Sequence, residues 1–140
     1  MKNYRTTIDT LAALSFLLIY INDDKIGSFM FMFLPIIGLM TLGGASGGFI
    51  NVGSEMLNGI LGGTYLLLVF ASAIYLIIRG MKGKPESKLS IVACLLMFSL
   101  VLVIMSKTNF NNITSIIGLT IFIGFSSLSV IQNYKGLKRI

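Results

Sequence analysis

Apolar residues run along the chain in long blocks that are separated by short charged or turn-forming stretches. Five such blocks can be drawn, at residues 8–21, 26–44, 59–78, 89–106 and 113–131. A bilayer core is about 30 Å thick, so a helix that crosses it needs roughly 20 residues. The last three blocks approach or reach this length, whereas the first is short. The pattern predicts an all-α, polytopic integral membrane helix bundle with four or five transmembrane helices.

The composition agrees with a membrane protein. Hydrophobic residues make up 55% of the 140 positions and charged residues 11%, whereas about a quarter of the residues in soluble domains are charged. The longest stretch between the long blocks, residues 45–58, is too short to fold alone. We therefore expect residues 1–140 to form a single transmembrane domain that contacts the lipid bilayer.

The distribution of Lys and Arg predicts how the chain lies across the membrane, because cytoplasmic loops carry an excess of both residues. Two stretches are basic, the loop after the third block and the C-terminal tail. Their cations are Arg79, Lys82, Lys84, Lys88, Lys135, Lys138 and Arg139. Two crossings separate the two stretches, so both should lie on the cytoplasmic side, where they would contact anionic lipid headgroups.

The side of the N-terminus stays open at this point. Five crossings would place the N-terminus outside, opposite the C-terminus. Lys2 and Arg5 precede the first block, and cations in that position favour an N-terminus on the cytoplasmic side. That arrangement requires four crossings, with one of the first two blocks not passing through the membrane.

A glycine-rich stretch at the end of the second block includes Gly43, Gly44, Gly47 and Gly48. It lacks the Gly-Lys-Ser/Thr ending of a phosphate-binding loop. The pairs Gly43/Gly47 and Gly44/Gly48 are four residues apart, which is the spacing that lets helices approach closely in lipid. Three interpretations remain: a flexible break between helices, close helix packing, or a re-entrant element that lines a ligand. Small residues along the fifth block, Gly118 among them, predict a second close-packing face.

A polar stripe leads into the third block. Its members Asn51, Glu55, Asn58 and Tyr65 recur at helical spacing, so on one continuous helix they share a face. An ionisable group inside a membrane is by default a functional candidate, and a hydrated Glu55 would attract cations or carry a proton. The stripe therefore indicates either an interfacial start of the helix or the lining of a pore or transport path.

The sequence supplies little for catalysis. It has no His, which is the commonest general base, and its only thiol, Cys94, lies within an apolar block where we expect it to pack. Asp23 and Asp24 could form half of a paired-carboxylate metal site, but a solvated turn explains them better. Asp9 lies near the start of the first block, where it would cap the helix. We predict no metal, no cofactor and no enzymatic activity.

These observations favour a non-enzymatic membrane protein that acts as an accessory, sensing or protective (immunity-type) subunit through helix packing and its basic cytoplasmic loop. The small-residue faces predict a homo-oligomer or a membrane-protein partner. Nucleic acid is not an expected partner, because no aromatic residues are interleaved with the cations. The alternative is a small oligomeric channel, pore or transporter that uses the polar stripe. By analogy of size with small envelope proteins, the expected location is the bacterial cytoplasmic (inner) membrane, with the C-terminus in the cytoplasm.

Overall fold

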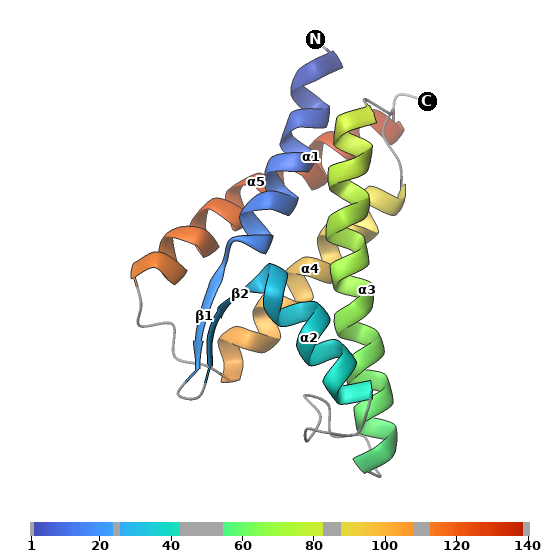
Figure 1. The fold of residues 1–140 in the computed structure, drawn as a ribbon. Coiled ribbons are helices and arrows are strands. Elements are labelled where there is room, and N and C mark those ends of the chain that lie inside the picture. The colour runs from blue at the N-terminus through green and yellow to red at the C-terminus, as the bar shows by residue number, and fades with distance from the viewer. Residues whose placement is uncertain (1, 24–25, 43–54, 83–87, 108–112, 139–140) are drawn as a thin grey trace.

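A computed structural model describes residues 2–23, 26–42, 55–82, 88–107 and 113–138 of the chain (Figure 1). Side chains are described for residues 7–20, 29–42, 59–82, 88–106 and 113–138. The described elements are five helices and a two-stranded ribbon. In chain order they are α1 (Lys2–Leu17), β1 (Tyr20–Asp23), β2 (Ile26–Phe29), α2 (Met30–Leu42), α3 (Glu55–Lys82), α4 (Lys88–Lys107) and α5 (Ile113–Lys138).

Three of these helices are long and apolar enough to span a membrane. The spanning segments are Gly59–Lys82 in α3, Lys88–Ser106 in α4 and Ile113–Lys138 in α5. They support the prediction of a membrane protein built as a helix bundle. The first two apolar blocks form shorter helices of 16 and 13 residues, so three of the four or five predicted spans meet the length that a crossing needs.

A short antiparallel ribbon joins α1 to α2, and the helical prediction missed it. The last turn of α1 tightens, because the backbone N–H of Ile19 donates to the carbonyl of Phe16 at 3.1 Å. The chain then extends, and the strands pair with Tyr20 opposite Phe29 and Asp23 opposite Ile26. The solvated turn predicted at Asp23 and Asp24 thus falls at the tip of this ribbon, where Asp23 closes β1; Asp24 lies outside the described residues.

The ribbon is fastened to the bundle at its base. Ser115 of α5 donates a hydrogen bond of 2.6 Å from its hydroxyl to the backbone carbonyl of Tyr20. The rings of Tyr20 and Phe29 meet edge to face, with their centroids 5.2 Å apart. The carbonyl that accepts from Ser115 belongs to an outer strand edge, so this contact satisfies one of the backbone groups that a two-stranded ribbon leaves open.

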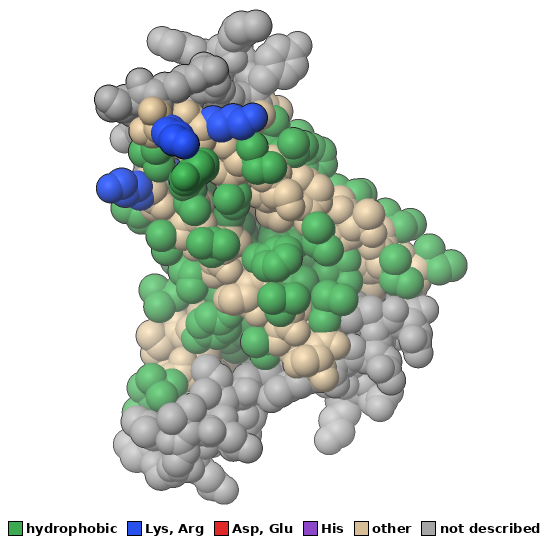
Figure 2. Space-filling view, turned by 180° about the vertical axis from the view of Figure 1, so that it is seen from behind, with side chains coloured by type: hydrophobic (Ala, Val, Ile, Leu, Met, Phe, Trp, Pro, Cys, Tyr) green, Lys and Arg blue, Asp and Glu red, His purple; other side chains and the backbone are tan. Residues whose placement is uncertain are grey.

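Both chain termini lie at the same end of the bundle (Figure 1). The helices α1 and α4 begin at this end, and α3 and α5 finish there. The ribbon points toward the opposite end, and α2 starts about half-way along the bundle and runs beside the half of α3 that is farther from the termini. We call the end that holds the two termini the basic end, because the exposed cations of α3, α4 and α5 gather there, as Figure 2 shows for one face.

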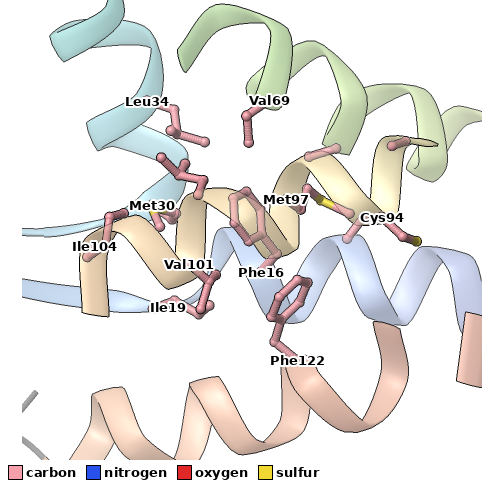
Figure 3. Close-up of a cluster of buried hydrophobic side chains, with 14 of the residues drawn as sticks. Phe16, Ile19, Met30, Leu34, Val69, Cys94, Met97, Val101, Ile104 and Phe122 are labelled. Carbon is pink, nitrogen blue, oxygen red and sulfur yellow. The ribbon is translucent and has the colours of Figure 1, made fainter. Parts of the chain in front are cut away.

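The hydrophobic core lies where α1, α3, α4 and α5 meet. The rings of Phe16 and Phe122 pack against each other at its centre, with centroids 5.3 Å apart and planes inclined by 50° (Figure 3). Met97 and Val101 of α4 and Val69 of α3 complete this layer, and all of these side chains are almost fully buried. The layer is apolar throughout and separates the two ends of the bundle.

Glycines bring α2 and α3 into close contact. A Cβ added at Gly63 would lie 2.6 Å from Cγ of Leu42 and 2.8 Å from the carbonyl oxygen of Gly38, and one added at Gly59 would lie 2.8 Å from the carbonyl oxygen of Thr41. Gly59 and Gly63 are four residues apart, which is the close-packing spacing of membrane helices. The sequence analysis applied this rule elsewhere in the chain and missed this pair.

The glycines that the sequence predicted to pack closely are not the ones at this contact. Gly43, Gly44, Gly47 and Gly48 lie outside the described residues. A Cβ at Gly118 would lie 3.6 Å from Cα of Ile19, which is ordinary van der Waals contact. Gly118 therefore faces the end of α1, but the spacing there does not require glycine.

Replacing Gly63 by alanine tests the contact between α2 and α3. We expect Gly63→Ala to lower the free energy of unfolding by about 1–3 kcal/mol, because overpacking forces backbone and side-chain shifts. Gly124→Ala is the matched control, since a Cβ at Gly124 meets nothing within 4 Å. Unfolding of the purified protein in detergent micelles measures both variants. Equal stability of the two variants would contradict the close contact.

Candidate functional site

A buried ion pair links the first helix to the third. Asp9 of α1 is 6% exposed and Arg79 of α3 is 5% exposed. The Nη1 atom of Arg79 lies 3.9 Å from Oδ2 of Asp9. Charges inside an apolar bundle are costly and are tolerated when they are paired and hydrogen-bonded. The pair therefore either stabilises the contact between α1 and α3 or forms part of a functional site. The other contacts of the two residues help to distinguish these roles.

The helix α5 supplies neutral donors to the same carboxylate. The hydroxyl of Ser129 donates a short hydrogen bond to Oδ1 of Asp9, and Nδ2 of Asn133 donates to the same oxygen at 3.1 Å. Ser129 and Asn133 share one face of α5 because they are four residues apart. Nδ2 of Asn133 also lies 2.9 Å from the carbonyl of Ser129, which holds the amide in place. One carboxylate thus joins three helices.

The helix α4 contacts this site through the thiol of Cys94. The Sγ atom of Cys94 in α4 lies 3.4 Å from the hydroxyl oxygen of Ser129. A hydroxyl has one hydrogen, and that of Ser129 is directed to Asp9, so the thiol must be the donor in this contact. We call Asp9, Arg79, Cys94, Ser129 and Asn133 the Asp9 cluster. At this cluster α1, α3, α4 and α5 are connected by polar groups.

Two of these residues have roles that differ from the predicted ones. Arg79 was expected to be a membrane-surface cation, but its side chain is buried against Asp9 because α3 continues to Lys82. Asp9 was expected to cap the first helix, but α1 begins at Lys2, so Asp9 lies two turns inside it. The sequence does contain a signal for this pair. Asp9 is the single acid inside the first apolar block, and Arg79 is a cation at the edge of the third, a combination that favours pairing.

The other predicted cations keep their surface positions where they are described. The exposed residues are Lys82, Lys88, Lys135 and Lys138. Lys84 and Arg139 lie outside the described part of the chain. These four exposed lysines lie at the basic end, close to the last or first turn of a helix. The basic end therefore presents a set of exposed cations next to the buried Asp9 cluster.

The polar stripe that suggested a pore is only partly described. Asn51 lies outside the described residues, and of Glu55 and Asn58 only the backbone, in the first turn of α3, is described. Tyr65 is half-buried, and its hydroxyl lies 2.6 Å from Oγ of Ser99 in α4. Ser99 donates its own hydrogen to the carbonyl of Leu96, so Tyr65 is the donor to Ser99. This bond joins α3 to α4 inside the bundle.

The chemistry that the Asp9 cluster offers is acid–base chemistry at one carboxylate. Within the described ranges, no group of three or more His, Cys, Asp or Glu residues could hold a metal ion.

Comparisons with known proteins found no matching family model, curated protein or solved structure. Function is therefore inferred from the residues and their geometry.

The coupling between Asp9 and Arg79 can be measured with a double-mutant cycle. We expect Asp9→Asn and Arg79→Gln each to destabilise the protein by about 3–5 kcal/mol, because each leaves a buried group without its partner charge. The double variant should lose less than the sum of the two. Unfolding in mixed micelles provides the free energies.

Lys82→Gln is the control for this cycle, since it removes an exposed cation one turn beyond Arg79 and should change stability by less than about 0.5 kcal/mol. Strictly additive losses for Asp9→Asn and Arg79→Gln would show that the pair is not a stabilising unit.

Proposed function

We propose that this chain is a small non-enzymatic multi-pass membrane protein that acts as an accessory, sensing or protective subunit through helix packing and its basic cytoplasmic end. The observation that carries the proposal is that buried polar groups connect the helices to one another. Asp9 accepts from Ser129 and Asn133 of α5 and pairs with Arg79 of α3. Tyr65 of α3 bonds to Ser99 of α4. The outward side chains of α4 and α5 are mostly apolar, as for Leu95, Leu102, Ile117 and Leu128, and such faces fit lipid or another helix.

We propose four crossings, made by α1, α3, α4 and α5. The 16 residues of α1 cover about 24 Å, and the four residues of β1 continue in the same direction for about 13 Å. Together they match the thickness of a bilayer core. The strand β2 and the helix α2 then form a re-entrant element, because they enter and leave at the end opposite the termini. The close glycine contacts with α3 support this element.

We propose that the basic end faces the cytoplasm. Lys2 and Arg5 in α1 share this end with the described lysines of α3, α4 and α5, while Lys107 ends α4 at the opposite end. This distribution follows the excess of cations in cytoplasmic loops. It also removes the conflict over the N-terminus, because four crossings place both termini on one side. There the lysines contribute about 1 kcal/mol each to contact with an anionic leaflet.

Single-cysteine labelling tests the topology. In a Cys94→Ala background we expect Asn3→Cys and Lys138→Cys to react with an impermeant maleimide from the cytoplasmic side of oriented vesicles. Asn111→Cys, between α4 and α5, should react from the other side. Labelling of Asn3→Cys and Lys138→Cys from opposite sides would support five crossings and exclude the proposed topology.

The accessory role is tested by what accompanies the protein out of the native membrane. We expect a second copy or a second membrane protein to co-purify in native nanodiscs, and the mass to fall when Lys82, Lys88, Lys135 and Lys138 are all changed to Gln. Lys107→Gln at the opposite end is the control. A lone monomer with a mass insensitive to these changes, or ion flux in liposomes that depends on Glu55, would overturn the accessory role.

A further inference from the structure

The polarity of the buried side chains differs along the length of the bundle. Toward the basic end lie most of the buried polar residues, beside apolar ones such as Leu76 and Ala93; the polar ones are Asp9, Arg79, Ser90, Ser126, Ser129 and Asn133. In the middle the buried residues are apolar, with Phe16, Met97 and Phe122 at the centre (Figure 3). The buried polar residues beyond this layer, Thr41 and Ser115, donate to backbone carbonyls. The buried polar residues around Asp9 therefore extend toward the basic end of the bundle and not toward the opposite end.

On the neutral side chains of the half nearer the basic end, two buried polar atoms have no hydrogen-bond partner among the described residues. One is Oγ of Ser90, whose residue is fully buried, and the other is Oε1 of Gln132. Ser90 precedes Cys94 by one turn of α4, and Asn133 follows Ser129 by one turn of α5. The two helices run in opposite directions and touch at Cys94 and Ser129. Ser90 therefore faces the same turn of α5 as Asn133, between the Asp9 cluster and the basic end.

Buried polar atoms of this kind are normally satisfied by an internal water. We propose that water enters from the basic end as far as the Asp9 cluster, and that Asp9 is a proton-binding site open to that end alone. Ser90 and Gln132 supply hydrogen-bonding groups along the way. The apolar layer of Phe16, Met97 and Phe122 stops water from going further.

The proton step balances on these residues. A carboxylate oxygen of Asp9 forms an O–H bond with a proton from hydronium, and a water molecule is left. Among the contacts described above, the charged or titratable groups at this carboxylate are Arg79 from α3 and, through Ser129, the thiol of Cys94 from α4. From α5 come the neutral groups of Ser129 and Asn133. The helix α2 runs beside the half of α3 that is farther from the termini.

Proton binding would change how α1 is held. A neutral Asp9 no longer attracts Arg79, whereas its hydrogen bonds to α5 persist. Arg79 lies one turn before the end of α3 at Lys82, so its long side chain can extend to the aqueous surface. The contact of α1 with α3 then depends on the proton supply at the basic end. This deepens the proposed function by naming the proton as the signal that a sensing subunit would read, and it rests on that proposal.

The only thiol of the chain is a reporter inside the site. We expect native Cys94 to react with a small, impermeant methanethiosulfonate reagent from the same side as Lys138→Cys in a Cys94→Ala background. The same reagent should not react with Met97→Cys, because Met97 lies in the apolar layer. It should also not react with Leu95→Cys, because Leu95 is 55% exposed on the outer face of α4. Both controls also carry Cys94→Ala.

Infrared spectroscopy provides a second readout that does not depend on labelling. We expect a protonated-carboxyl band that appears on acidification, shifts in heavy water and is lost in Asp9→Asn but kept in Asp23→Asn. Unreactive Cys94 together with a spectrum unchanged by Asp9→Asn would overturn the inference. If Cys94 and Lys138→Cys react from the same side but that side is extracellular, the inference stands and the proposed orientation fails.

Discussion

The rest of the structure depends on the requirement that charge inside an apolar bundle be compensated. Asp9 lies two turns into α1 and Arg79 one turn from the end of α3, and neither side chain is exposed to solvent. An isolated charge there would be expensive, so the two helices are held in the register that brings the groups together. Ser129 and Asn133 then fix α5 on the same carboxylate, and Cys94 fixes α4.

A second constraint acts on the half of the bundle farther from the termini. Backbone polar groups need partners in lipid, which excludes open strand edges unless protein or water covers them. The ribbon β1–β2 has its base tied to Ser115 of α5, and its tip carries charged residues in the sequence. The helix α2 approaches α3 closely because Gly38, Gly59 and Gly63 have no side chains. In this half, close backbone packing of α2 against α3 therefore acts beside the hydrogen bonds of Ser115 and Tyr65.

The two halves suit different tasks. The basic half combines a buried carboxylate, neutral hydrogen-bonding groups and exposed lysines, which are the parts that a proton-responsive contact at a membrane surface needs. The other half contains an apolar layer and the close contact of α2 with α3, which suit a barrier and a scaffold. Under the proposed function, this arrangement would act on a partner because a weaker contact of α1 with α3 alters the surface that the bundle presents.

Much of this architecture follows from the sequence alone. The long apolar blocks predict α3, α4 and α5 because hydrophobic length is a local property, and the cations predict one basic end. The tertiary structure decided the rest. Blocks near Tyr20 and Phe29 are compatible with helix or strand, since short apolar runs do not distinguish the two. The pairing of Asp9 with Arg79, and of Gly63 with Gly38, depends on which helix faces meet, and that is determined by packing between residues far apart in the chain.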